Sequence, residues 1–231
     1  MATPEPVSAD KQSGPRSRKG VATRARLLAA AKEIFEEDGF LDARISDIAE
    51  RAGLSHGSFY HYFDSKEEVF REVAEAVEEN LREPMDSIIL NPDSTLSPLE
   101  RITEGIRVHM ESYRREARIM GVIELVSRYD EHMRQVRAER RQRSGEQVAL
   151  AIRQLQDHGM ADPDIDPEVA AAVLGSMTSR FPEMWLVEGQ LDIDFERGVE
   201  QLTRAFVNAL GLKETAAKPR SRRAPVRSAR A

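Results

Sequence analysis

The chain of 231 residues contains no cysteine and only one tryptophan. Disulfides, thiolate-bound zinc and cysteine nucleophiles are therefore excluded, and a reducing cytosol is the default compartment. No segment approaches the ~18 consecutive apolar residues of a membrane span. The first twenty residues lack the apolar stretch of a secretory signal. We therefore expect a cytoplasmic protein with no membrane partner.

The formal net charge is −6, but the charge is unevenly distributed. Residues 1–20 carry four basic and two acidic side chains, and residues 213–231 carry seven basic side chains and one acidic. We expect both segments to be disordered, a basic N-terminal arm and a basic tail on an acidic body. This distribution fits a protein that touches DNA locally and repels it elsewhere, and it equally fits a solvated surface with disordered ends.

The sequence between these two segments has helical periodicity and no strand or hairpin signal. Glycines that suit a left-handed C′ position end several apolar stripes, at Gly39, Gly53, Gly159 and Gly189. N-cap serines precede others, at Ser46, Ser55, Ser65 and Ser97, and Glu68 and Glu100 are expected to complete capping boxes with Ser65 and Ser97. Pro84 is expected to end the fourth helix, and Phe181-Pro182 to kink the eighth. We predict an all-α fold with about nine helices: 22–38, 46–52, 56–63, 66–84, 98–115, 117–127, 131–158, 167–188 and 194–210.

Two short helices joined by a tight turn indicate a helix-turn-helix. Gly53 allows the sharp turn, and Leu54 can fill the core beside it. The second helix begins with small polar residues, which suits a recognition helix that enters the major groove by its N-terminal end. Aromatic hydroxyls and imidazoles follow at 60–62 and can reach phosphates. Lys66 opens the next helix, where its ammonium and the unpaired N–H groups would bind a phosphate.

Residues 22–76 resemble the TetR family of bacterial regulators. The resemblance is carried by the ordered run SDIAERAGLSHGSFYHYF from Ser46 to Phe63, followed by Ser65-Lys66-Glu67-Glu68. It implies a three-helix head over residues 21–65 and a ligand-binding and dimerisation domain over residues 66–212. Ile48, Phe59 and Phe63 would be core. The residues implied to face DNA are Ser46, Ser55, His56, Gly57, Ser58, Tyr60, His61 and Lys66.

The resemblance also implies a homodimer formed by the last two helices, about 167–188 and 194–210. A bound effector would move the fourth and sixth helices and change the separation of the two recognition helices. Those helices must lie about one DNA turn, ~34 Å, or a multiple apart to bind a palindromic operator. We expect a repressor that a small, apolar effector releases from double-stranded DNA.

The segment 84–190 is rich in methionine and aromatic residues, which suit an adaptable apolar pocket and equally suit an ordinary core. Arg114, Arg115 and Arg118 could bind an anionic head group, or could simply pair with neighbouring glutamates. The residues that we expect to contact the ligand are Met110, Tyr113, Met120, Met177, Phe181, Met184 and Trp185.

Other functions remain open at this point. The five histidines form no metal-binding pair, and Asp162, Asp164 and Asp166 lack the glycine and later glutamate of a calcium loop. We therefore expect no catalytic residues, no metal and no cofactor, although a helical enzyme is one alternative. An architectural protein that binds DNA without sequence preference is another, and a protein-binding scaffold is a third.

Overall fold

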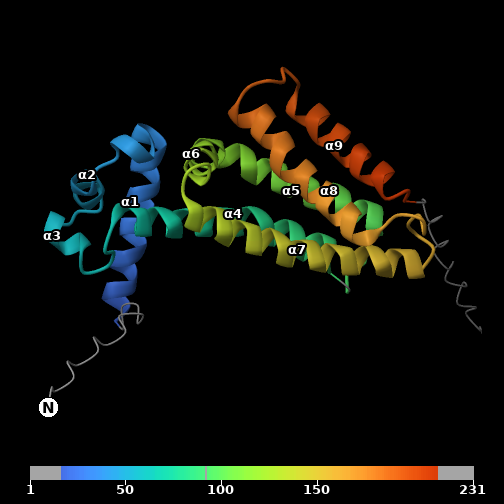
Figure 1. Cartoon of the computed structure of the whole chain (residues 1–231), viewed down its shortest axis with the longest axis horizontal. Helices are drawn as coiled ribbons and strands as arrows, with labels where there is room; N and C mark the ends of the chain where they lie inside the picture. Colours follow the sequence, from blue (N-terminus) through green and yellow to red (C-terminus); the bar gives the residue numbers. More distant parts are fainter. Residues whose placement is uncertain (1–16, 92, 213–231) are drawn as a thin grey trace, which may run out of the picture.

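The computed structural model describes residues 17–91 and 93–212, and all regular secondary structure in this part of the chain is helical. The predicted all-α architecture is confirmed. The helix-turn-helix head consists of α1 (Arg18–Asp42), α2 (Ile45–Arg51) and α3 (His56–Phe59). Figure 1 shows this head at one end of the long helix α4 (Lys66–Ile89), with the remaining helices gathered along the rest of α4.

Helix α1 begins earlier than the sequence suggested. Ser17 caps it, since the Ser17 hydroxyl accepts a hydrogen bond from the Gly20 N–H at 3.1 Å. Residues 18–20, which we placed in a disordered arm, are therefore helical, and Arg18 and Lys19 lie on the first turn of α1. The rest of the expected arm and the expected tail at 213–231 lie outside the described residues.

The short helices of the head also differ from expectation at their ends. Arg44, not Ser46, occupies the N-cap of α2, and the Ser46 hydroxyl donates to Asp47 instead. Ser55 caps α3 as predicted, but α3 ends at Phe59, four residues before the expected end. Gly53 has φ +68°, the left-handed conformation that the turn between α2 and α3 requires.

Helix α4 continues through Pro84, so the predicted end at this proline is wrong. The proline removes one backbone hydrogen bond, but packing against α5 (Pro98–Arg115) compensates. A Cβ built on Gly105 would lie 2.6 Å from the Ile89 side chain. A larger residue at position 105 would therefore force the Ile89 side chain to move.

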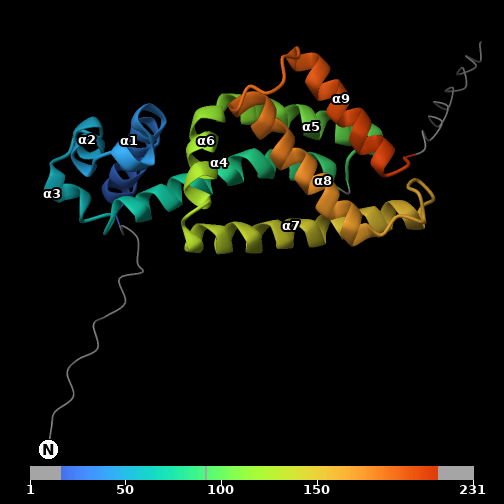
Figure 2. The same ribbon diagram turned by 45° about the horizontal axis from the view of Figure 1, so that its top comes forward.

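The other helices of the body follow the predicted ranges closely. They are α6 (Ala117–Ser127), α7 (Glu131–Asp157), α8 (Pro167–Pro182) and α9 (Phe195–Ala209). At the predicted kink, α8 ends at Pro182 and a π-helical turn, η1 (Glu183–Val187), continues the chain. Figure 2 shows α7 running alongside α4 on one side of the body, with α5 and α8 above them.

Two clusters of buried apolar side chains hold these helices together. One is centred on α5, α8 and α9. The other joins the head to the body, because it contains Phe35 of α1, Phe70 of α4 and Met120 of α6. The head and the first half of the body therefore share one continuous core, whereas the domain boundary after residue 65 stays a prediction.

Candidate nucleic-acid interface and ligand cavity

Most of the residues expected to contact DNA are exposed on the head. The exposed ones are Ser46, Ser55, His56, Gly57, Tyr60 and His61, while Ser58 is half-buried. Ile48 and Phe59 are fully buried and Phe63 is 1% exposed, so the three predicted core positions are confirmed. The buried and exposed residues of the motif thus separate cleanly onto two sides.

Short-range contacts fix the first turn of α3. The Ser55 hydroxyl accepts from the Ser58 N–H at 3.3 Å and lies 2.7 Å from the Ser58 hydroxyl. The His56 and Tyr60 rings meet edge to face at 5.4 Å. A Cβ at Gly57 would meet nothing within 4 Å, so this side of α3 is open. The face offers hydroxyl and imidazole groups where the backbone can approach a groove closely.

The ammonium group of Lys66 makes its hydrogen bonds within the protein. Its ammonium donates to the carbonyl oxygens of Phe40, Leu41 and Ala43 at 2.7, 3.0 and 2.9 Å and lies 4.8 Å from the centre of the Phe40 ring. An ammonium has three N–H donors, so none is left for a phosphate in this structure. We therefore omit Lys66 from the DNA-contacting residues proposed below.

An ion pair links the head directly to the body. Lys32 of α1 lies 2.9 Å from the Glu116 carboxylate, where α6 begins, and 3.1 Å from Glu36. Burial alone would lower the pKa of Lys32, but hydrogen bonds to both carboxylates raise it above its ordinary value. Movement of α6 would therefore reach α1 through this pair as well as through the shared core.

The body contains a cavity of about 740 Å³ that is partly open to solvent and lies between α4, α5, α7 and α8, with α6 and α9 completing its wall. Of the seven residues predicted to bind a ligand, Tyr113 and Met120 line it. The other five do not line it. Met110 is fully buried in the α5–α8–α9 cluster, and Trp185 stacks on Phe195 at 5.7 Å over Gly198. Most of the aromatic side chains on which we based the prediction are thus ordinary core.

Sequence reasoning missed several wall residues of the cavity. Leu81, Met85 and Ile89 of α4 line it, and the expected helix end at Pro84 concealed the last two. His109 also lines it, one turn before Tyr113 on the same face of α5. The i, i+4 spacing of His109 and Tyr113 was the available signal.

His109 connects three helices at the cavity wall. Its Nδ1 lies 3.0 Å from the Leu81 carbonyl oxygen of α4, and its Nε2 lies 3.0 Å from the Thr178 carbonyl oxygen of α8. In an α-helix the Thr178 carbonyl would accept from residue 182, which is Pro182 and has no N–H. When Nε2 carries the proton, the imidazole donates to this carbonyl and takes the place of the hydrogen bond that the proline removes.

The arginines that sequence analysis considered for an anionic head group face elsewhere. Arg114 lies over the Phe195 ring at 3.8 Å, and Arg115 donates to the Ser112 hydroxyl at 2.8 Å. Neither these two nor Arg118 lines the cavity.

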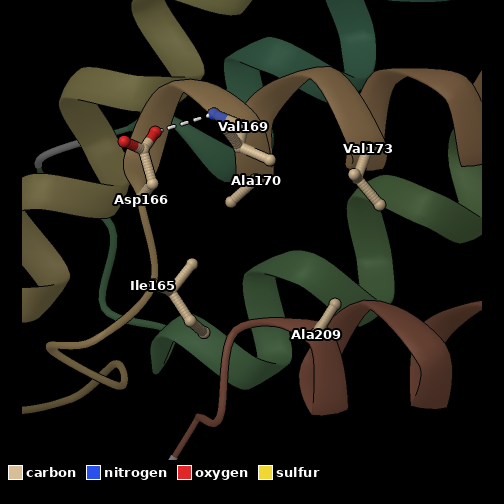
Figure 3. A pocket seen from close by; sticks show the side chains of 6 residues that line it. All are labelled: Ile165, Asp166, Val169, Ala170, Val173 and Ala209. Carbon is tan, nitrogen blue, oxygen red and sulfur yellow. Dashed lines mark hydrogen bonds between the residues drawn. The ribbon is translucent and has the colours of Figure 1, made fainter.

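A second, smaller pocket of about 260 Å³ lies between the start of α8 and the end of α9. Figure 3 shows Ile165, Val169 and Val173 beside it, with Ala209 approaching from α9. Val169 is 62% exposed and Val173 48% exposed. An apolar strip of α8 therefore faces outward.

The residues that the structure describes contain no cluster of three or more potential ligands placed to hold a metal ion. No described helix is long and apolar enough to cross a membrane.

The short capped helix, its exposed polar face and the buried side behind it define a helix-turn-helix DNA-binding domain. Residues 27–73 match the family model of the bacterial regulatory proteins of the tetR family.

Curated relatives are similar to this chain in its N-terminal third. The uncharacterized HTH-type transcriptional regulator YdgC of Bacillus subtilis is 43% identical over 72 residues, 31% of this chain and 37% of that protein. The HTH-type transcriptional repressor KstR2 of Mycobacterium tuberculosis is 39% identical over 79 residues, 34% of this chain and 38% of that protein. The matches thus span less than half the length of these relatives.

Solved structures extend the likeness to the whole fold. A putative TetR-family regulator from Mesorhizobium loti has a TM-score of 0.68 at 18% identity, covering 84% of this chain and 98% of that one. SmeT, the repressor of a multidrug efflux pump in Stenotrophomonas maltophilia, has a TM-score of 0.67 at 22% identity, covering 83% and 91%. At such identities the likeness establishes the fold alone.

Proposed function

We propose that this chain is a ligand-responsive transcriptional regulator that binds a palindromic operator in double-stranded DNA. The proposal rests on the first turn of α3, which presents small polar residues to solvent while Phe59 behind them is fully buried. These residues are Ser55, His56, Gly57 and Ser58. Tyr60 and His61 extend this face and are placed to contact phosphates, with Ser46 at the start of α2. In this proposal, the side chains of His56 and Ser58 contact base edges in the major groove and determine the sequence preference.

The chain acts as a homodimer in this proposal. The outward apolar strip of Val169 and Val173 on α8, beside Ala209 of α9, supports an interface formed by these two helices. A two-fold dimer buries the same strip on both copies and presents two heads to two half-sites.

A small molecule in the cavity would release the protein from DNA. Met120 supports this route because it lines the cavity and also belongs to the core that contains Phe35 and Phe59 of the head. The ion pair between Lys32 and Glu116 is a second connection. Action as a repressor fits relatives such as KstR2, which carries that description.

Selection of bound sequences from a random duplex DNA pool at about physiological salt tests the proposal. We expect one enriched palindrome for the purified chain and a relaxed or altered base preference for His56→Ala, since a good base contact discriminates by roughly 1–3 kcal/mol. Tyr129→Phe, a change at an exposed tyrosine of the body, is the control and should enrich the same palindrome. Binding without any enrichment, weakening uniformly with salt, would contradict the proposal and favour an architectural protein.

A further inference from the structure

The cavity wall contains a buried hydroxyl without a partner. Tyr113 of α5 is 2% exposed and lines the cavity. Its hydroxyl has no hydrogen-bond partner among the residues that the structure describes, and no other buried unpartnered side-chain atom of this part belongs to the wall. A buried hydroxyl without a partner is costly, so a bound molecule that supplies one would gain from it.

The Tyr113 hydroxyl is uncharged. Burial, followed by the nearby carboxylates of Glu124 and Glu183, raises its pKa above the ordinary tyrosine range. At neutral pH the phenol therefore keeps its proton and can donate a hydrogen bond to an acceptor oxygen.

The charged groups of the wall are already paired with one another. Arg137 lies 2.5 Å from Glu78 and also pairs with Glu124, and Arg82 lies 3.0 Å from Asp86. Of the five basic and six acidic residues in the wall, only Arg141 and Glu146 take part in no ion pair among the described residues. Arg141 and Glu146 are both exposed, so an ionic group that lies beside the buried Tyr113 would have to break one of the other pairs. Loss of one partner of a buried pair is unfavourable.

The two other buried polar side chains of the wall, His109 and Thr178, are also occupied. Both ring nitrogens of His109 contact backbone carbonyls, and the Thr178 hydroxyl donates to the Leu174 and Gly175 carbonyls. The rest of the inner wall is apolar, with Leu81, Met85 and Met120 among its members.

We propose that the cavity takes a neutral, mainly apolar molecule with one oxygen acceptor, such as a ketone, an ester or an alcohol, whose oxygen accepts from the Tyr113 hydroxyl. The inference rests on the proposed function, since it names the class of effector for that cavity. It selects against the carboxylate or phosphate head group that the arginine-rich sequence of α5 and α6 also allowed.

Displacement of the neutral fluorophore phenylnaphthylamine from the full chain tests the inference. The competitors share a ten-carbon skeleton and differ in the polar group: methyl octyl ketone, decanoate, decylammonium and decane. We expect the ketone to bind more tightly than either ion. In Tyr113→Phe the affinity for the ketone should fall by roughly 3- to 10-fold, the effect of one neutral hydrogen bond, and that for decane should stay the same.

Two variants keep the outcome interpretable. Tyr129→Phe, the same change at a tyrosine that is 52% exposed, should leave every affinity unchanged. Met120→Trp, which fills the cavity, should weaken all four competitors together. Tighter binding of decanoate than of the ketone, or an unchanged ketone affinity in Tyr113→Phe, would overturn the inference.

These failures are distinguishable from failure of the proposed function. If all four competitors bind with equal affinity, the cavity is functional and only the assignment of its polar contact is wrong. If the fluorophore does not bind to the wild-type chain, the effector cavity itself is contradicted. Neither result changes the outcome of the DNA selection, which tests the proposed function independently.

Discussion

A single half-buried cation, Lys66, orders the segment where the head meets α4. Its ammonium replaces the N–H partners that the carbonyls of residues 40, 41 and 43 lack after Gly39 interrupts α1 with φ +75°. Hydrogen bonds to a charged group each contribute about 1.5–3 kcal/mol, so this residue acts mainly through the stability of the head.

We predict that Lys66→Met lowers the free energy of unfolding by about 2–4 kcal/mol, measured in urea, because three carbonyls lose their donor. Lys19→Met, on the exposed first turn of α1, should leave stability unchanged. The slope of log affinity for DNA against log salt should be the same for Lys66→Met and the wild type. A slope reduced by about 0.9 with unchanged stability would instead identify Lys66 as a phosphate contact.

At the scale of elements, proline and histidine act as a pair at the junction of α4, α5 and α8. Pro182 leaves the Thr178 carbonyl without a helical donor, and His109 supplies one from α5. The same imidazole contacts the Leu81 carbonyl oxygen in α4, three residues before Pro84. The junction therefore ties the cavity wall to the helix that leads into the head.

We predict that His109→Leu destabilises the chain by about 1–3 kcal/mol, since the Thr178 carbonyl is then buried without a donor. In Pro182→Ala the restored backbone N–H can serve that carbonyl, so the cost of His109→Leu should be smaller in this background. Urea unfolding of the two single variants and the double variant gives the coupling. Equal costs in both backgrounds would show that His109 stabilises the junction by other contacts.

Local signals were sufficient to predict most of the elements. The Ser97 capping box opens α5 with both reciprocal hydrogen bonds in place, and Asp194 caps α9. Left-handed glycines follow α7 at Gly159 and η1 at Gly189, where each was expected. These features depend on a few neighbouring residues, which is why sequence alone locates them.

The features that sequence reasoning missed depend on contacts between distant segments. Helix α4 passes through Pro84, and its last turn packs with Ile89 against Gly105 on another helix. Trp185 was predicted to contact the ligand, but it packs over Gly198 on α9. The Glu68 carboxylate was expected to complete a capping box with Ser65, yet it accepts from the Asp64 N–H one residue earlier. Only the assembled helices determine these partners.

In the whole molecule, the outward strip of α8 exposes apolar side chains that no other part of the described chain covers. Val169 and Val173 lie one turn apart on the same face, and both are largely exposed. A shared interface through this strip would fix the distance between two heads, which is what recognition of a palindrome requires.

We predict that Val169→Asp combined with Val173→Asp converts a dimer into a monomer of 26.0 kDa in sedimentation experiments. Each substitution would bury a charge at the interface, so dimer affinity should fall on the order of 100-fold or more. Leu150→Asp, the same kind of change at an exposed apolar residue of α7, should leave the dimer intact. A dimer that survives the double substitution would place the interface elsewhere.

The central claim is that occupancy of the cavity and binding of DNA are linked within one molecule. The most direct test is the affinity for the selected palindrome, with and without methyl octyl ketone at a concentration that fully displaces phenylnaphthylamine. We predict that the ketone weakens DNA binding by about 5- to 150-fold, and that Tyr113→Phe requires more ketone for the same effect. An unchanged affinity for DNA while the ketone fills the cavity would contradict the claim.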